Sequence, residues 1–482
     1  MERAGTQHVK MPDLIERLPC FERDVAVTLT RDFHRAGEEL YLVGGVVRDL
    51  LLERGRADLD FATSATPDQT RQIGRRAGAD GMFDVGAAFG TIGLVYQSSD
   101  DQAEDLTIEI TTYRSEIYPT RDRRPEVSHG VSLHEDLSRR DLTINAIALD
   151  ALTGELIDPF GGIADLHQER IRAVGNPAAR FDEDPLRILR AARFAAQLGF
   201  EIDPETLQAM RQTGPELERI SVERVTAELN RLLVAPSVEL GLRMLDAADL
   251  FPHILPELVP MVTDDRDGGV ARHKDIWDHT IQVVDQSPSR LIVRWAALLH
   301  DAAKPWTRSV DENGTVHFFG HELAGAALAR KLLKRLKQEN HLQERVAKIV
   351  AMHLRPSSYD PDWTDSAVRR LALEAGNTFE DLVDLAAADV TSAREHRRQA
   401  AARRIEGLRE HFARLEAQRT LEQLQSPLDG NDLMAMFDRP PGRWIGDIKD
   451  RLREMVIDGD LDPDDRETAA ELATEWITAA GE

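Results

Sequence analysis

The segment from Leu42 to Phe61 constrains the fold more than any other stretch of this 482-residue chain. It starts with a short apolar run, turns at Gly44 and Gly45, continues with helical periodicity over 46–54, and ends in a second apolar run. This alternation predicts strands over 40–43 and 59–62 around a short helix, which is the corner of a mixed α/β domain. Glycines in such a turn let the backbone approach an anion at the start of a helix, where N–H groups favour negative charge.

Two carboxylates, Asp58 and Asp60, accompany the second strand of this corner. Side chains on one face of a strand repeat every second residue, so the two carboxylates are expected about 7 Å apart on one face. That spacing suits one Mg²⁺ or a pair of them, as phosphoryl-transfer chemistry requires. Arg48, one turn into the helix, is placed to reach the same anion as the glycine turn. The alternative is an ordinary βαβ-like corner with a glycine turn and two solvated aspartates.

Further strands are expected at 91–96 and 106–113. The second of these alternates, and Glu109 points away from the face that carries Ile108 and Ile110. Glu109 is therefore a candidate third catalytic acid beside the aspartate pair, or else an exposed strand glutamate. After the D-P-F-G-G cluster at 158–162 the strand signals stop, and helical periodicity is expected for nearly all of the remaining chain.

The composition is that of a globular chain, with 42% apolar and 30% charged residues. No apolar run approaches the roughly 18–20 residues that a membrane helix requires, so we expect no membrane partner. The single cysteine, Cys20, excludes an intrachain disulfide and, with an N-terminus unlike a secretory signal, favours a cytoplasmic location. The net charge of −25 means that a polyanion would have to meet a local basic surface.

A second charged pattern begins at Phe181 with F-D-E-D-P-L-R-I-L-R-A-A-R-F. Asp184 followed by proline predicts a helix start, with Asp at N-cap and Pro at N1. Arg187, Arg190 and Arg193 then fall within an arc of about 120°. These arginines form either a solvated stripe or, with Asp184, a surface that selects a nucleobase. A carboxylate accepts from the exocyclic amine of cytosine or adenine and a guanidinium donates to the adjacent ring nitrogen, whereas uracil and guanine present a carbonyl there.

Five motifs follow one another over about residues 40–235: G-G-V-V-R-D with D-L-D, R-R-D-L-T-I-N-A, D-P-F-G-G, E-D-P-L-R-I-L-R-A-A-R-F and I-S-V-E-R-V-T-A-E-L. In this order they resemble the bacterial class II tRNA nucleotidyltransferase and poly(A) polymerase family. The departures are small, with Leu142 where phenylalanine is commoner and Glu53 where glycine is usual. The Ala-, Arg- and Asp-rich composition resembles an actinobacterial branch of that family.

The resemblance implies a role for each matching residue. Asp58 and Asp60 would carry catalytic Mg²⁺. The implied nucleotide-binding residues are Gly44, Gly45, Arg48, Arg140, Asp141, Asp184, Arg187, Arg190 and Arg193. The first three would bind the triphosphate, the next two the base and sugar, and the last four would form and support a protein template for C or A. The implied reaction is attack by a tRNA 3′-hydroxyl on the α-phosphate of CTP or ATP, which releases pyrophosphate. A poly(A) polymerase or A-only transferase shares these motifs and is the alternative.

The chain beyond residue 272 carries histidines and aspartates on its expected helices: an H-D pair after L-L, a histidine 21 residues earlier, and an aspartate far downstream. A lone histidine on a helix is more often structural, but such residues from several helices also converge on divalent ions in bundle cores. The pattern resembles the HD phosphohydrolase domain. The implied ligands of a second divalent metal are His279, His300, Asp301 and Asp389, with His321 and His353 for a further ion. The alternative is a helical scaffold that only supports tRNA.

The two resemblances together imply an α+β fold: a polymerase-β-type nucleotidyltransferase head followed by an all-α neck, body and tail. We expect an N-terminal leader and helix over 1–35, the head over 36–160, the neck over 161–235, a body connection over 236–270, an HD-type helical domain over 271–400 and a helical tail over 401–482. The implied partners are tRNA, ATP and CTP, and no obligatory protein partner is evident.

Two basic runs are candidates for tRNA contact, although a solvated basic helix face is the simpler interpretation of each. The first run is Arg330, Lys331, Lys334, Arg335 and Lys337, and the second is Arg394, Arg397, Arg398, Arg403, Arg404 and Arg409. A polar loop adds Arg121, Arg123 and Arg124. Two rival functions come from other classes: a metal-dependent HD phosphohydrolase whose head is a relic, and a non-catalytic tRNA-binding protein.

Overall fold

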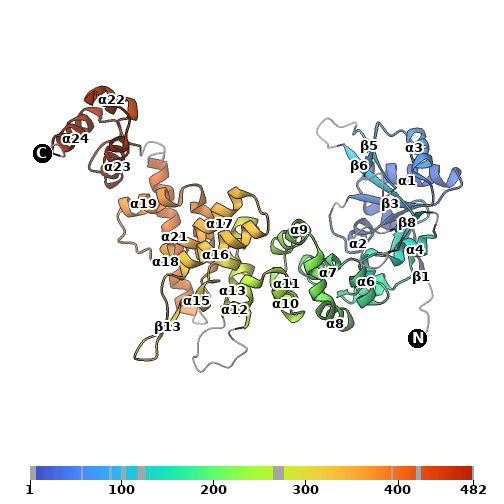
Figure 1. Ribbon diagram of the computed structural model, residues 1–482. Coiled ribbons are helices and arrows are strands. Elements are labelled where there is room, and N and C mark those ends of the chain that lie inside the picture. Colours follow the sequence, from blue (N-terminus) through green and yellow to red (C-terminus); the bar gives the residue numbers. More distant parts are fainter. Residues whose placement is uncertain are drawn as a thin grey trace. The chain divides into compact units, whose positions relative to one another are not determined.

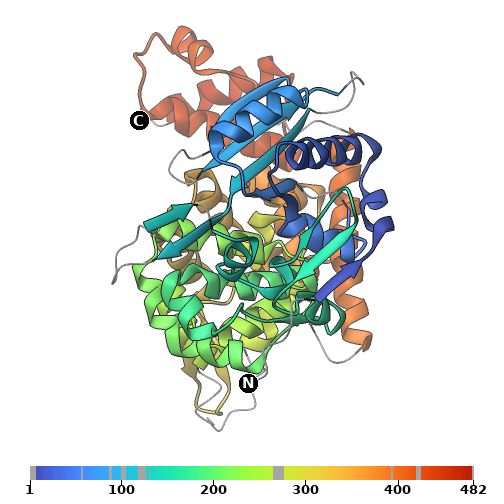
Figure 2. The ribbon, with the colours of Figure 1, turned by 90° about the vertical axis from the view of Figure 1, so that its right-hand side faces the viewer.

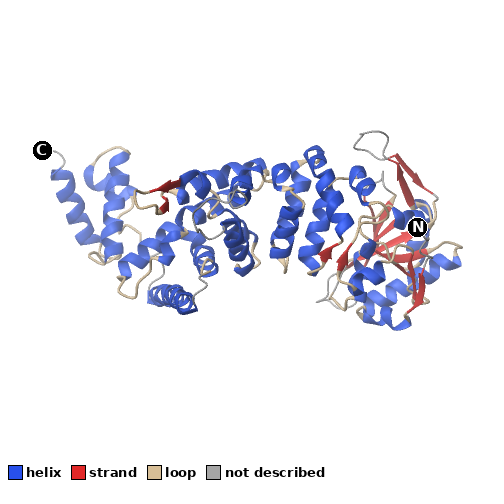
Figure 3. Ribbon diagram, turned by 90° about the horizontal axis from the view of Figure 1, so that it is seen from below, coloured by secondary structure: helices blue, strands red, loops and turns tan. Residues whose placement is uncertain are grey.

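The computed structural model describes residues 7–55, 58–85, 90–98, 105–117, 126–129, 131–263, 276–391, 395–418 and 425–479. The chain forms two compact units, Met1–Pro256 and Glu257–Glu482. Most of the strands belong to the first unit, and the second is almost entirely helical (Figure 3).

The first unit is built on an eight-stranded sheet with the order β1-β10-β9-β2-β3-β6-β5-β4. Its strands are β1 Gln7–Lys10, β2 Leu40–Val43, β3 Leu59–Thr63, β4 Gly81–Val85, β5 Thr91–Tyr96, β6 Leu106–Thr112, β9 Ala148–Leu149 and β10 Glu155–Asp158. The pair β3/β6 is parallel, and the other described pairs of this sheet are antiparallel. Helices α1 (Cys20–Arg35) and α3 (Pro67–Arg76) lie side by side against the sheet (Figures 1 and 2).

The strands predicted from periodicity are confirmed to within one residue at each end, and the predicted helix after the glycine turn is α2, Gly45–Leu51. Asp58 lies just before β3 instead of within it. The expectation of a leader outside the head is wrong for residues 7–10, which form β1 and pair with β10 at the edge of the sheet. Four residues carry too little periodicity to identify a strand, and pairing with a segment about 150 residues away is invisible to a local pattern.

Smaller elements complete the first unit. Around the sheet lie η1 Pro12–Arg17, β7 Arg114–Ile117, β8 Glu126–His129, α4 Leu133–Ser138, η3 Thr143–Asn145, α5 Gly162–His167 and β11 Arg170–Ile171. The helical continuation is α6 Pro177–Glu183, α7 Leu186–Leu198, α8 Pro204–Thr213, η4 Gly214–Arg219, α9 Val222–Leu233, α10 Val238–Ala247 and α11 Phe251–Ile254, with η5 Pro256–Leu258 at the boundary. The strand β12, Glu201–Ile202, pairs in parallel with β11.

The second unit contains two helical groups. The first comprises α12 Val259–Thr263, α13 Ile276–Gln286, α14 Leu291–Leu299, α15 Lys304–Thr307, α16 His321–Arg335, α17 Asn340–Met352, α18 Leu354–Ser357, α19 Asp365–Ala375, η6 Gly376–Thr378, α20 Phe379–Ala388 and α21 Glu395–Gln418. The second comprises α22 Gly430–Phe437, α23 Arg443–Asp458 and α24 Arg466–Ala479, which share a core that includes Leu433 and Leu452.

The expectation that strands end at residue 162 is wrong at two places, the pair β11/β12 and a hairpin of β13 (Arg308–Val310) and β14 (Val316–Phe318). These strands have only two or three residues each, which is too short for the alternation that identifies a strand. None of the helices in the described part of the chain has the length and apolar character needed to cross a bilayer.

Candidate functional site

The first candidate site lies at the start of β3. Asp60 on β3 is in register with Glu109 on the parallel neighbour β6. The two carboxylates therefore project from adjacent strands, and the axes of adjacent strands are about 4.8 Å apart. Ile108 and Ile110 are fully buried, which confirms the prediction that Glu109 faces away from them. Asp58 is exposed immediately before the strand. The structure therefore brings all three predicted acids to one end of β3.

The electrostatics of this corner favour a cation. Desolvation by the surrounding protein, together with the charges of Glu109 and Asp58 and against the opposing charge of Arg140, raises the pKa of Asp60 to about 6. Like charges crowded in this way are relieved by a positive ion, and carboxylate oxygens are the donors that hard divalent cations prefer. The three residues therefore fit a divalent metal by donor chemistry and charge.

The guanidinium of Arg140 lies directly beside the glycine turn. Gly44 has φ +77°, and a Cβ there would lie 3.1 Å from Nη1 of Arg140. Within the described part of the chain, the Nη atoms of Arg140 make long hydrogen bonds, 3.5 Å to the carbonyl of Asn145 and 3.4 Å to Asp136. The side chain is 20% exposed. A weakly held guanidinium beside a glycine turn and a helix start fits a phosphate.

Arg48, which was expected to bind the triphosphate, is hydrogen-bonded to protein groups instead. It is 4% exposed, and its guanidinium donates to both carboxylate oxygens of Asp49 at 2.8 and 2.9 Å and to Oδ1 of Asn145 at 2.8 Å. Its guanidinium carbon also lies 5.0 Å from the centre of the Phe194 ring. A direct contact between Arg48 and phosphate would require these bonds to be exchanged.

The segment after α4 is tied to α7 by a buried ion pair. Nε and Nη2 of Arg190 lie 2.7 and 2.6 Å from Oδ2 of Asp141, while Oδ1 accepts from the Leu142 N–H and the Asn145 amide. Burial alone would raise the pKa of Asp141, but Arg190 and these two donors lower it to about 2. Asp141, predicted to bind the base and sugar, and Arg190, predicted to support the template, are thus bonded to each other and hold two parts of the protein together.

The predicted base-selecting residues, Asp184 and Arg187, both carry protein partners. Helix α7 begins at Leu186 with Pro185 as its N-cap, one residue later than predicted, and Asp184 accepts from the Leu186 N–H at 3.2 Å. The other oxygen of Asp184 accepts from Arg224 at 2.9 Å. Arg187 donates to the carbonyl of Arg139 at 2.8 Å and to Glu183 at 2.8 Å.

The solvated-stripe alternative for the α7 arginines is wrong for two of them. Arg187 and Arg193 are 8% and 7% exposed, and Arg193 donates to the buried Glu228 on α9 at 2.6 Å. Sequence reasoning missed Arg224 and Glu228 as partners of the template. Both lie in the I-S-V-E-R-V-T-A-E-L motif, which was recognised without a role for its charged residues.

The second candidate site gathers six ligand-type side chains at the ends of five helices. They are His279 on α13, His300 and Asp301 after α14, His321 at the start of α16, His353 after α17 and Asp389 after α20. Two sets of three each have ligand atoms within 4.8 Å of one another: His279, His300 and Asp389, and Asp301, His321 and His353. In the described part of the chain these are the sets that meet this criterion, and the acids at β3 do not converge so closely.

Asp301 lies between the two sets. Its Oδ2 is 3.2 Å from Nε2 of His300, and its Oδ1 is 3.4 Å from Nε2 of His321. Oδ2 also accepts from Lys304 at 2.5 Å, whereas Oδ1 is buried without a hydrogen-bond partner among the described residues. A carboxylate with one oxygen toward each set has the geometry of a bridging ligand.

The histidine tautomers favour metal ions over hydrogen bonds at the centre. Nδ1 of His321 and Nδ1 of His353 each lie 2.7 Å from a main-chain carbonyl oxygen, which can only accept. Each Nδ1 therefore carries a proton, and the two Nε2 atoms face each other at 3.3 Å. Burial lowers the pKa of His353 to about 4, which keeps this ring neutral and leaves a lone pair on its Nε2. Two Nε2 atoms directed at one point beside a carboxylate fit a divalent metal.

The predicted RNA-contacting runs are partly neutralised by neighbouring acids. Arg330 pairs with Glu344 and Arg335 pairs with Glu257 in the first run. Arg398 pairs with Glu395 in the second run, and Arg409 pairs with Asp384. Arg121, Arg123, Arg124 and Arg394 lie outside the described residues, as does the side chain of Arg397. The structure therefore does not turn either run into a single unpaired basic surface.

Three protein-family models match consecutive parts of the chain. Residues 40–172 match the poly A polymerase head domain, residues 199–261 match a probable RNA and SrmB-binding site of polymerase A, and residues 270–394 match the HD domain. Both the head and HD families are generally divalent-metal dependent. The fold and these matches define a nucleotidyltransferase with a polymerase-type head, a helical RNA-binding region and an HD domain.

Relatives of known function cover nearly the whole chain. A CCA-adding enzyme of Geobacillus sp. (strain WCH70) is 34% identical over 92% of this chain and 94% of its own length, and one of Enterococcus faecalis is 34% identical over 91% and 92%. The structure of the Bacillus stearothermophilus CCA-adding enzyme in complex with CTP matches with a TM-score of 0.67 and 27% identity, covering 96% of this chain and 99% of that one. The chain belongs to the CCA-adding enzyme family. The actinobacterial branch stays a prediction.

Proposed function

We propose that this nucleotidyltransferase adds C, C and A in turn to the 3′ end of tRNA, with CTP and ATP as donors, in the cytoplasm. The observation that carries the proposal is the corner at β3. There Asp60 and Glu109 stand in register, while Arg140, whose Nη atoms make only long hydrogen bonds to the described residues, faces the Gly44 turn. A cation site next to an anion site is what transfer of a nucleotidyl group requires.

Different residues of this corner bind the metal, bind the phosphates and position the surrounding segments. Asp58 and Asp60, with Glu109 beside them, would hold Mg²⁺, which when bound supplies charge neutralisation and activation of the attacking hydroxyl. Gly44 admits the triphosphate to the start of α2, because any larger residue would displace Arg140. Arg140 donates to the phosphates, while Arg48 and Asp141 keep the surrounding segments in place through Asn145 and Arg190.

Selection of the base is proposed to occur by exchange of partners. Asp184 gives up Arg224 and Arg187 gives up Glu183, and each then bonds to the edge of cytosine or adenine. The partner bonds keep both charges satisfied when no nucleotide is present, which avoids an unpaired buried charge. A pyrimidine or purine with a carbonyl in place of the amine would leave Asp184 facing an acceptor, so U and G are rejected.

The test uses tRNA that lacks its last one, two or three nucleotides, with each of the four nucleoside triphosphates supplied in turn and the ends sequenced. Addition of C, C and A followed by a stop is expected, whereas an A-tail of open length would indicate the poly(A) alternative. Asp60→Ala should abolish incorporation. The control Asp68→Ala removes a solvent-exposed aspartate of α3 and should leave incorporation unchanged.

We propose a second activity, metal-dependent phosphohydrolysis, at the cluster around Asp301, where two sets of ligand atoms share one bridging carboxylate. Divalent ions there would supply Lewis-acid activation of a phosphoester and of water. Asp60→Ala should leave hydrolysis of a chromogenic phosphoester intact, and Asp301→Asn should abolish it without affecting incorporation. Loss of both activities in either variant would contradict two separate sites. If the unaltered protein incorporates nucleotides but hydrolyses no phosphoester, the helices around Asp301 act only as a scaffold that supports tRNA.

A further inference from the structure

Phe194, in the third turn of α7, is contacted by three arginine side chains. The guanidinium carbons of Arg48, Arg190 and Arg193 lie 5.0, 5.6 and 3.9 Å from the centre of its ring. A guanidinium within about 6 Å over an aromatic ring is attracted by the negative face of that ring. Phe194, Arg48 and Arg193 are 6%, 4% and 7% exposed, so little water screens this attraction, which is strongest in such desolvated places.

Two of these arginines are also joined to each other by a series of hydrogen bonds. Arg48 on α2 donates to Oδ1 of Asn145 at 2.8 Å, and the Asn145 amide donates to Oδ1 of Asp141 at 3.2 Å. Oδ2 of Asp141 accepts from Nε of Arg190 on α7 at 2.7 Å. The Phe194 ring lies against both the first and the last residue of this series. The ring therefore closes a contact circuit that runs from α2 through the segment 141–145 to α7.

The third arginine connects the circuit to α9. Arg193 donates to the buried carboxylate of Glu228 at 2.6 Å. Glu228 lies one turn beyond Arg224 on α9, and Arg224 donates to Asp184, the predicted base-selecting carboxylate, at 2.9 Å. The Phe194 ring is thus connected to the glycine turn through α2 and to the base-selecting end of α7 through α9.

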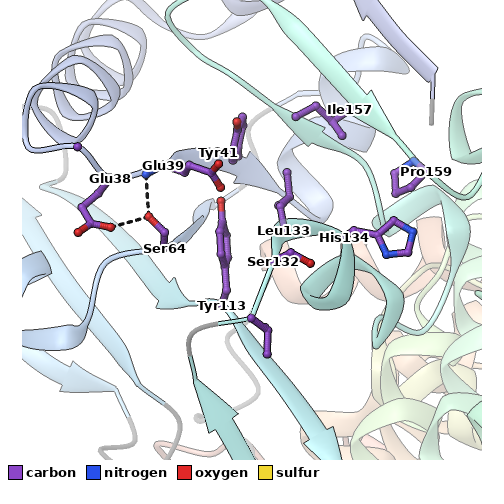
Figure 4. Close-up of a pocket in the computed structure, with 12 residues that line it drawn as sticks. Glu38, Glu39, Tyr41, Ser64, Tyr113, Ser132, Leu133, His134, Ile157 and Pro159 are labelled. Carbon is purple, nitrogen blue, oxygen red and sulfur yellow. Dashed lines mark hydrogen bonds between the residues drawn. The ribbon is translucent and has the colours of Figure 1, made fainter.

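The contact circuit belongs to the packed interior of the first unit. Phe194 is the one aromatic residue of α7, and its neighbours Ala191 and Ala195 on that helix are fully buried. The first unit also has a pocket of about 750 Å³ at the ends of β2, β3, β6 and β10, beside Tyr113 (Figure 4). None of the described residues that line this pocket belongs to the circuit. The described contacts of the Phe194 ring are therefore with protein groups and do not involve that pocket.

We propose that Phe194 is a positioning residue for nucleotidyl transfer, an inference that rests on the function proposed above. Its ring holds Arg48 and Arg190 in place, which keeps the glycine turn, where the triphosphate is proposed to bind, at a fixed distance from the helix that selects the base. A displacement of about 1 Å between reacting groups can slow a reaction about 100-fold, so a looser circuit slows the chemical step. Phe194 itself touches no substrate, and its effect passes through the arginines.

The test replaces Phe194 with phenylalanines that carry one, two or three fluorine atoms on the ring, introduced into the full-length protein by nonsense suppression. Fluorine draws electron density from the ring face and weakens its attraction for cations, while the shape of the side chain changes little. We expect kcat/KM for addition of C and A to fall stepwise, by about tenfold with three fluorines, which corresponds to about 1.4 kcal/mol. The loss should lie in kcat, with KM for CTP and ATP nearly constant, because the ring contacts neither nucleotide.

The matched control is Phe200, which is 4% exposed and takes no part in the three arginine contacts. The same trifluorinated residue at Phe200 should leave kcat/KM unchanged, and the melting temperature of each variant checks that it folds. Equal kcat/KM across the fluorine series at Phe194, or a loss confined to KM, would overturn this inference and leave the proposed function intact. If the unaltered protein adds neither C nor A to tRNA, the proposed function itself fails, and the inference fails with it.

Discussion

The pair formed by Asp141 and Arg190 gives the sharpest prediction about stability. Asp141 is 8% exposed and accepts from Arg190, Asn145 and the Leu142 N–H. The pKa of this carboxyl falls from 3.8 to about 2, which corresponds to about 2 kcal/mol of folding free energy at neutral pH. Because the folded-state pKa is depressed, this contribution is present above pH 4 and is lost as the pH falls toward 2.

Replacing Arg190 with methionine should weaken this pH dependence. The variant keeps the Asn145 and Leu142 donors but loses the Arg190 charge and hydrogen bond, so burial should bring the pKa of Asp141 back up toward its unfolded value, and stability should gain less between pH 2 and 4. Breaking a buried pair costs about 3–5 kcal/mol, and we expect about 3 because the Arg190 side chain is 34% exposed. The double variant with Asp141→Asn should recover part of the loss, since no buried charge is then unpaired.

The assay is urea unfolding from pH 3 to pH 7 with two probes. All six tryptophans lie in the second unit, so their fluorescence reports that unit and serves as an internal control. Hydrogen exchange of the peptides over 139–149 and 186–198 reports the pair itself. A loss below about 1 kcal/mol at pH 7, or a pH dependence of the Arg190 variant as steep as that of the unaltered protein, would refute the assignment of this ion pair as a buried link between the two segments.

Three further predictions concern the two sites. Gly44→Ala should lower the free energy of unfolding by about 1–3 kcal/mol and reduce incorporation, because it places a Cβ on a backbone of positive φ and 3.1 Å from Arg140. The control Gly37→Ala has a similar φ but open space around the new Cβ. Equal effects of the two substitutions would contradict the proposed clash with Arg140. Asp301→Asn should lower the divalent metal that copurifies, measured by mass spectrometry, and unaltered metal content would exclude the bridging role. Arg187→Met should erase discrimination among the four triphosphates in kcat/KM; a uniform loss with the same preference would instead indicate a purely structural arginine.

The sequence alone determined several secondary-structure elements and the faces that their side chains occupy. Strand alternation identified β2, β3, β5 and β6 almost to the residue, because side chains that face a core must repeat every second position. The same rule placed Glu109 on the face opposite the buried isoleucines. The two-residue spacing of Asp58 and Asp60 identified these acids as candidate metal ligands. The resemblance to the HD domain named the six histidines and aspartates that the structure brings together in the second unit, and their role as metal ligands stays a prediction.

Partners distant in the chain were decided only by tertiary packing. Arg48 meets Asn145 across 97 positions, and Arg224 meets Asp184 across 40, and no local periodicity encodes either bond. Which nitrogen of each histidine faces the centre depends on carbonyls at helix ends, and the pocket beside Tyr113 exists only where four strands end together. Short-range patterns determine which elements form and which faces they bury, whereas the satisfaction of each buried charge depends on which elements pack together.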